Sequence, residues 1–121
     1  MNYEVKISDD ESFVWQLPHE NMTMALANEM SQKATQLAST KNITKYLSDV
    51  RGIRNIDSPL KNFDFVHIDL RRVGYRDSDK IAVVHDPNDD SHDFIEFVST
   101  NAGYAIKPFT EVQKAIDWLS N

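Results

Sequence analysis

The sequence contains no cysteine, and its 121 residues include only three glycines and four prolines. The absence of cysteine excludes disulfides, thiolate catalysis and thiolate metal sites, and it is typical of cytoplasmic proteins. So little glycine and proline argues against a fibrous or disordered chain. No apolar run approaches the roughly 20 residues that span a bilayer, and the N-terminal residues do not resemble a signal peptide. We therefore expect a cytoplasmic protein without membrane insertion.

An excess of acidic residues gives the chain a formal net charge of −6. Such a chain repels nucleic-acid phosphates, so we expect no nucleic-acid partner. Hydrophobic residues make up 40% of the sequence and charged residues 26%, which is ordinary globular composition. Because the length matches one typical domain, we expect a single domain over residues 1–121.

The N-terminal part of the chain shows two kinds of hydrophobic pattern. Apolar and polar residues alternate over residues 3–7 and 13–17, on either side of a short polar turn. This alternation predicts an antiparallel hairpin with one buried face. Helical spacing follows over residues 21–39, where Asn21 or Thr23 could cap the helix. Three methionines here could form an adaptable binding face, although their spacing favours core packing: Met22, Met24 and Met30.

Strands and helices alternate through the rest of the sequence. We expect strands over residues 43–50, 81–84 and 104–109, and helices over residues 58–72, 91–103 and 110–119. The strand from Ile81 to Val84 is wholly apolar, as in a parallel strand that is covered on both faces. The predicted order is ββαβαβαβα, an α/β domain whose mostly parallel sheet carries an N-terminal antiparallel hairpin.

Capping signals and apolar stripes refine the predicted helices. Three helix starts carry such signals: Ser58 before Pro59, Ser91, and a capping box over residues 110–113. Two stripes are expected to face the core: Leu60, Phe63, His67 and Leu70 in the helix over 58–72, and Phe94, Ile95 and Val98 in the next helix.

Four short motifs, taken in order, resemble the bacterial SpoIIAA-like family, whose members are relatives of the STAS domain. They are Asp49-x-Arg51-Gly52, the strand Lys80–Val84, Asn101-x-Gly103 leading to Phe109, and Ala115-x-x-Trp118-Leu119. The resemblance covers essentially the whole chain. It implies a sheet of four or five strands with helices packed on it.

The same resemblance suggests a modification site at Ser58. In STAS proteins that antagonise anti-sigma factors, a serine in an Asp-Ser-Ser-Gly motif is phosphorylated at the start of the helix after the third strand. The chain has Asp57-Ser58-Pro59-Leu60 at the matching place, without the second serine and the glycine. Ser58 is therefore either a phosphorylation site or a simple helix cap, and its charge environment at a helix start suits both.

Ligands of open parallel sheets bind beyond the carboxyl ends of the strands. This rule gathers five candidate partner- or ligand-binding residues at one rim: Asp49, Arg51, Ser58, His85 and Asp86. His85 and Asp86 could act as an acid–base pair, but neighbouring strand residues point to opposite faces, so we assign no catalytic residue. The acidic loop from Asp86 to Asp93 either holds a cation or simply precedes a helix; it lacks an EF-hand pattern, so we assign no metal and no cofactor.

An alternative likeness, to response-regulator receiver domains, rests on Asp9-Asp10, Asp49 and Lys107-Pro108. A receiver would need helix, strand and helix between Asp10 and Asp49, whereas the chain provides one strand and one helix. The acidic pair would then lie in a hairpin turn, so we set this interpretation aside.

The preferred hypothesis is a non-enzymatic binding or regulatory domain that contacts an unidentified regulatory protein. The alternative is a small-ligand binding protein for a lipid or an anionic metabolite, and an enzyme ranks third. The predicted hairpin exposes a sheet edge, which could also pair two copies into a homodimer.

Overall fold

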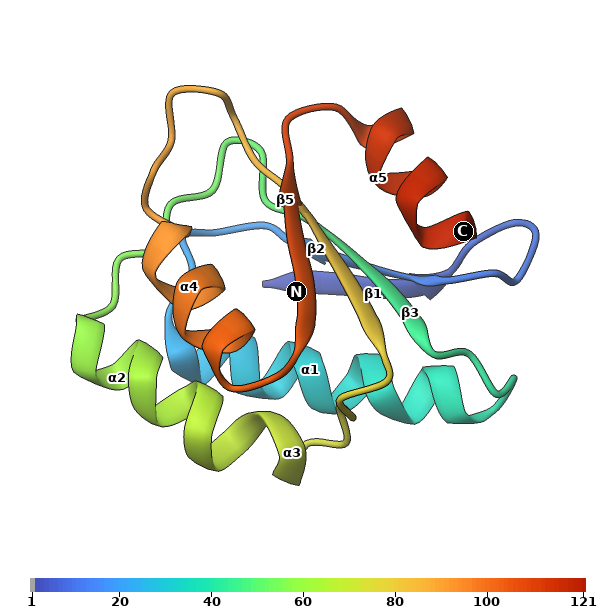
Figure 1. The fold of residues 1–121 in the computed structure, drawn as a ribbon, viewed down its shortest axis with the longest axis horizontal. Coiled ribbons are helices and arrows are strands. Elements are labelled where there is room, and N and C mark those ends of the chain that lie inside the picture. Colours follow the sequence, from blue (N-terminus) through green and yellow to red (C-terminus); the bar gives the residue numbers. More distant parts are fainter. Residues whose placement is uncertain (1) are drawn as a thin grey trace.

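The five strands lie side by side in the same order as in the chain (Figure 1). The computed structural model describes residues 2–121. Only the first pair of strands is antiparallel, and each later strand runs parallel to the one before it. The predicted α/β order and the mixed sheet are therefore confirmed. The strands are β1 (Tyr3–Ile7), β2 (Val14–Pro18), β3 (Lys45–Asp49), β4 (Lys80–Val84) and β5 (Ala105–Phe109).

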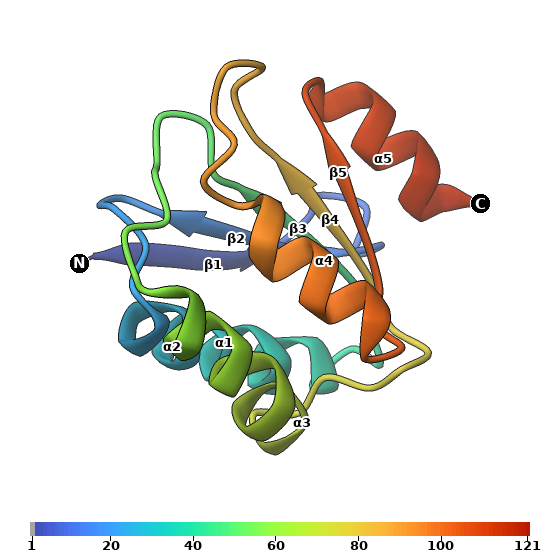
Figure 2. The same cartoon turned by 60° about the vertical axis from the view of Figure 1, so that its left-hand side comes forward.

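The helices cover both faces of this sheet. Three helical stretches share one face and the last helix lies on the other (Figures 1 and 2). The first face carries α1 (Met24–Ser39), a continuous second stretch, and α4 (Asp93–Asn101). The second stretch consists of α2 (Pro59–Asp64), a π-helical turn (Phe65–Asp69) and α3 (Leu70–Arg72). The other face carries α5 (Val112–Ser120). In the described part of the chain, no helix combines the length and apolar character needed to cross a bilayer.

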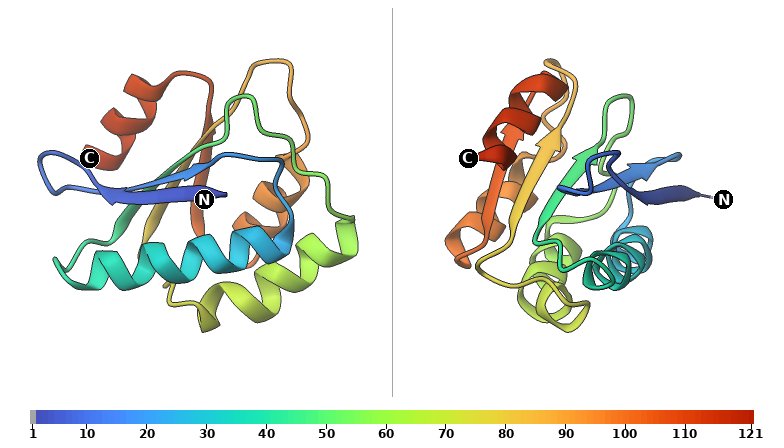
Figure 3. Two further views of the ribbon diagram at one scale, coloured as in Figure 1. Left: turned by 180° about the vertical axis from the view of Figure 1, so that it is seen from behind. Right: turned by 90° about the vertical axis from the view of Figure 1, so that its right-hand side faces the viewer.

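Alternation along the strands divides the core into two parts. Tyr46 and Ile81 point into the larger cluster under α1, α2 and α4, whereas Leu47 and Ala82 point into the smaller cluster under α5. Residues 81–84 of β4 are all buried, as the apolar run predicts for a strand covered on both faces. The two sheet edges are β1 and β5 (Figure 3).

Two of the predicted helix caps are confirmed. Thr23 Oγ1 accepts the N–H of Leu26 at 3.2 Å, and Ser58 Oγ accepts the N–H of Lys61 at 3.2 Å. Each side chain therefore satisfies a donor that a helix start leaves free. Pro59 follows Ser58 in the first helical turn, where a proline loses no hydrogen bond.

The other two caps were predicted wrongly. Helix α4 starts after His92, and Ser91 Oγ instead accepts the N–H of Asn55 at 2.9 Å. Helix α5 starts after Glu111, whose side chain makes no capping hydrogen bond. Lys114 Nζ lies 3.0 Å from Glu111 Oε2, so the carboxylate is engaged along the helix.

The helical stretch after Ser58 buries only one member of the predicted stripe, Leu70. The side chains of Leu60 and Phe63 are 69% and 45% exposed and His67 is exposed too, while Phe65 and Val66 pack inward instead. The π-helical turn explains the difference, because Leu70 N–H bonds to Phe65 O five residues earlier. Residues on either side of a wide turn cannot share one α-helical stripe.

Gly74 ends this stretch against α1. Its φ is +117°, and a Cβ added to it would lie 3.0 Å from the side chain of Thr35. Thr35 Oγ1 in turn donates to the carbonyl of Val73. Only a glycine fits here without strain, since the backbone is left-handed and the neighbouring side chain is held in place.

Candidate functional site

The carboxyl ends of β3 and β4 bring three of the predicted rim residues together. Arg51 donates from Nε and Nη2 to the two oxygens of Asp49 at 2.8 and 2.7 Å. The N–H of Gly52 donates to Asp86 Oδ2 at 2.7 Å, so the loop after β3 is fastened to the loop after β4. Partial burial would raise the pKa of Asp49, but hydrogen bonds from Arg51 outweigh it and hold the pKa below its usual value.

His85 and Asp86 do not form the acid–base pair considered from the sequence. His85 Nδ1 lies 2.8 Å from the main-chain oxygen of Asp86, while the Asp86 carboxylate accepts from Gly52. An orienting carboxylate would have to reach the imidazole itself. The arrangement gives His85 no such partner in Asp86.

Ser58 lies apart from this rim, at the exposed start of α2 (Figure 1). The loop from Gly52 to Asp57 carries the chain from the end of β3 to the helical layer. There Asp57 Oδ2 accepts the N–H of Met24 at 2.8 Å, which fixes the start of α2 beside the start of α1. The hydrogen bond from Met24 outweighs burial and lowers the pKa of Asp57. The sequence rule for parallel sheets could not foresee this separation, because it does not fix the path of the loop between Asp49 and Pro59.

The acidic loop after β4 is bonded to the loop after β3. Arg54 Nη1 lies 3.3 Å from Asp89 Oδ1, and His92 Nε2 lies 2.8 Å from the carbonyl oxygen of Ile53. Asp89 also accepts the N–H of Ser91 at 2.9 Å, and its carboxylate is buried. Within residues 2–121 no group of three or more histidine, aspartate or glutamate side chains is arranged to hold a metal ion. The charges at the rim are therefore used to join the two loops.

A different surface was missed by the sequence patterns. Helices α2 and α4 lie side by side (Figures 1 and 2). Together with the π-helical turn that follows α2 and the loop that precedes it, they expose large hydrophobic side chains. We call this surface the α2–α4 patch. Its members and their exposed fractions are Ile56 (60%), Leu60 (69%), Phe63 (45%), Ile68 (53%), Phe94 (43%) and Phe97 (66%).

The patch continues onto a stacked pair of rings. The centroids of Phe63 and His67 lie 4.3 Å apart, so the exposed imidazole extends the aromatic surface. In α4, Val98 is buried and Ile95 packs against the core as predicted, but Phe94 is exposed, and Glu96 and Ser99 are buried in addition. The sequence stripes assigned Leu60, Phe63 and Phe94 inward because large apolar residues usually seek the core.

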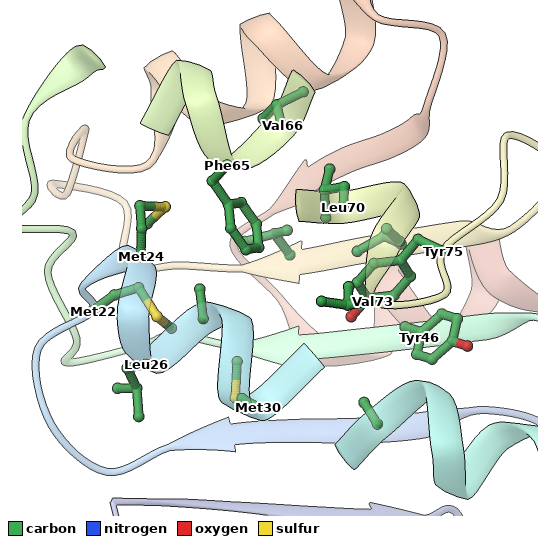
Figure 4. Packing of buried hydrophobic residues seen from close by; sticks show 14 of the residues in the cluster. Met22, Met24, Leu26, Met30, Tyr46, Phe65, Val66, Leu70, Val73 and Tyr75 are labelled. Atoms are coloured by element: carbon green, nitrogen blue, oxygen red, sulfur yellow. The ribbon is translucent and has the colours of Figure 1, made fainter. Parts of the chain in front are cut away.

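A cavity of about 100 Å³ lies inside the larger core cluster, between the sheet and the helices. Figure 4 shows Met22, Met24, Met30, Phe65 and Leu70 around this part of the core. All five belong to its lining, so the three methionines of this segment form part of the wall of the cavity. Thioether side chains are flexible and fit irregular spaces.

Polar side chains also reach the cavity. The hydroxyl of Tyr75 donates to Gln16 Oε1 at 2.7 Å, and burial raises the pKa of Tyr75 to about 12. Glu96 is 8% exposed, and its Oε2 is buried without a hydrogen-bond partner. Burial raises the pKa of Glu96 to about 7; His85 acts against this shift and Asp93 adds to it.

The fold and these surfaces define an α/β domain with a mixed five-stranded sheet, an exposed apolar patch on its helical layer and a cavity beneath that layer. Comparisons of the chain with protein-family models, with curated proteins and with solved structures find no match. The resemblance to SpoIIAA-like and STAS proteins therefore stays a prediction.

Proposed function

We propose that the protein is a non-enzymatic binding module that docks a partner protein on the α2–α4 patch. One observation carries the proposal: six large hydrophobic side chains, three of them phenylalanines, are each at least 43% exposed on α2 with its flanking loop and π-helical turn and on the neighbouring helix α4. Extended apolar patches on soluble domains mark interaction sites, and aromatic side chains dominate the binding energy of protein interfaces.

The charge of the molecule favours a protein as the partner. A net charge of −6 opposes binding to nucleic acid and to anionic membrane surfaces. Charged groups such as Lys61, paired with Asp57 at 3.6 Å, flank the patch and would form the polar rim of an interface.

The position of Ser58 supports a regulatory role within this proposal. Ser58 is exposed at the start of α2, two residues before Leu60 of the patch. A phosphate there would place negative charge beside the docking surface. Regulation of a cytoplasmic partner through a SpoIIAA-like or STAS-like mechanism is the function that this arrangement suggests.

A homodimer formed through the exposed edge of β1 is the competing proposal. It places the partner on the opposite side of α1 from the patch and leaves the exposed phenylalanines unexplained. Self-association is therefore measured alongside partner binding.

The test compares Leu60→Asp and Phe97→Asp with Gln113→Asp. Leu60 and Phe97 are the most exposed members of the patch, so charge there is tolerated by the fold, and Gln113 is an exposed residue of α5 on the other face of the sheet. Tagged proteins are used to capture partners from the native host, and the affinity for each captured protein is then measured with purified components. We expect both patch variants to weaken binding at least tenfold, and Gln113→Asp to leave it unchanged.

Light scattering on the three variants and the unmodified protein completes the experiment. The proposal is contradicted if the patch variants bind the captured partner as tightly as the unmodified protein does. It is also contradicted if the protein associates only with itself and the patch variants self-associate equally well. Circular dichroism checks that each variant is folded.

A further inference from the structure

Glu96 occupies an unusual position for a carboxyl group. It lies on α4 but points toward the sheet, lines the cavity and is 8% exposed. Among cavity-lining residues within 2–121, its Oε2 is the buried side-chain atom for which the structure gives no hydrogen-bond partner. Buried polar atoms in folded proteins are nearly always paired, so an unpaired carboxyl oxygen at a cavity needs an explanation.

The rest of the lining limits what could pair with Glu96. Apolar side chains make up most of the wall, including the three methionines, Phe65 and Leu70. Among the polar lining residues, the Tyr75 hydroxyl donates to Gln16 Oε1, Asn55 bonds to Asn62, and His92 bonds to the carbonyl oxygen of Ile53. The other polar lining residues include three with small hydroxyl groups, Ser31, Ser48 and Ser99. An occupant therefore meets a mostly apolar wall whose one carboxyl group is that of Glu96.

The size of the cavity sets the size of the occupant. Its volume of about 100 Å³ is smaller than the roughly 150 Å³ of an engineered apolar cavity that binds benzene. A molecule of about four to six non-hydrogen atoms fits on that scale without movement of the wall. A whole lipid does not fit, and an anionic metabolite would place a second negative charge beside the Glu96 carboxylate.

The wall also has features that permit entry. Phe65 stands in the π-helical turn, and single π-helical turns often occur at functional sites. Met22 lies just before α1 and Met24 is its first residue, and such side chains can change rotamer at little cost (Figure 4).

We propose that the cavity binds a small, largely apolar molecule with one hydrogen-bond-donating head group, a short-chain alcohol or amine, which donates to Glu96 Oε2. The apolar body lies against the methionines, Phe65 and Leu70, and the head group satisfies the carboxyl. The site is separate from the α2–α4 patch, so it stands or falls independently of the docking proposal.

The experiment uses two isomers, n-butanol and methyl propyl ether, which have the same atoms and nearly the same size but differ in the hydroxyl donor. Protein labelled with ¹³C at the methionine methyl groups is titrated with each at pH 7.5. We expect saturable shifts of the Met22, Met24 and Met30 methyl signals with n-butanol. Because a hydrogen bond to a charged group is worth about one power of ten in affinity, n-butanol should bind at least about tenfold more tightly than the ether.

Variants of Glu96 connect this preference to the carboxyl. Glu96→Leu should remove the preference for n-butanol, whereas Glu96→Gln should keep most of it because the amide oxygen still accepts a hydrogen bond. Glu20→Leu, at an exposed glutamate in a loop, is the control and should leave both affinities unchanged.

Three results overturn the proposal. They are the absence of saturable methionine shifts with either isomer, equal affinity for the alcohol and the ether, and a preference for the alcohol that survives in Glu96→Leu. If Glu96→Leu does not fold, Glu96→Gln and the comparison of the two isomers on the unmodified protein still decide the matter.

Discussion

The buried carboxyl of Glu96 should make the stability of the protein depend on pH in an unusual direction. Its pKa is raised from 4.5 to about 7 by burial, so between these values the folded chain keeps a proton that the unfolded chain releases. The free energy of unfolding therefore decreases as the pH rises from about 4.5 to 7, and the stabilisation from the bound proton is lost above pH 7. Most paired carboxylates have a lowered pKa in the folded state, so their contribution to stability is lost as the pH falls.

The size of this effect follows from the two pKa values. Each pH unit between them corresponds to about 1.4 kcal/mol, so the free energy of unfolding falls by at most roughly 3 kcal/mol across the window. Removing the charge with Glu96→Gln keeps the shape of the side chain. The variant should therefore match the unmodified protein below pH 5 and exceed it in stability by roughly 2–3 kcal/mol at pH 8.

Urea unfolding at several pH values from 4.5 to 8 measures this difference, with the fluorescence of Trp15 and Trp118 as the signal. Other titrating groups are present in both proteins, so their contributions largely cancel. His85 lowers the pKa of Glu96 and Asp93 raises it. The stability difference between glutamate and glutamine at position 96 is therefore measured again in a protein that carries His85→Gln. A stability difference that stays constant over the whole pH range, or one that shrinks as the pH rises, would refute the reasoning.

Two further substitutions test the fold near the candidate surfaces. Gly74→Ala should lower the free energy of unfolding by more than about 1 kcal/mol, and by more than Gly103→Ala does. Both glycines have positive φ, but only a Cβ at Gly74 would meet Thr35. Equal losses of stability in the two variants would contradict this reasoning. Ser58→Ala should cost about 1 kcal/mol through the lost cap, while Ser58→Asp should restore most of it. Chemical unfolding measures the stability of all these variants. A Ser58→Ala variant as stable as the unmodified protein would contradict the expected contribution of the cap.

The order of strands and helices could be predicted because several local signals agree. Alternation over β1 and β2, the apolar run of β4 and the cap at Ser58 each indicate one type of element. Parallel pairing of the later strands then follows from right-handed crossover connections. The register and the path of the loop from Gly52 to Asp57 do not follow from such patterns, so the separation of Ser58 from Asp49 was not predictable.

The candidate surfaces were harder to predict, and the reasons are physical. A π-helical turn has no clear sequence signature, and it changes which residues of the stretch after Ser58 face the core. Nor could the cavity be predicted, because a void depends on how side chains from distant elements fail to fill a space. The methionines gave a weak signal of an adaptable wall, but nothing in the sequence marks Glu96 as buried.

The departures from pattern are concentrated on two neighbouring helical stretches. Leu60 and Phe63 face outward where the stripe predicts burial, Phe94 and Phe97 are exposed on α4, and Glu96 on the same helix points inward. Elsewhere the strands and α5 follow their patterns closely, as expected of a sequence whose local and global preferences agree. Departures of this kind cost stability, and proteins keep them mainly where function requires them. The helical layer formed by α2, the π-helical turn and α4 is therefore the part of the molecule where binding is best sought: a partner on its outer face and a small molecule beneath it.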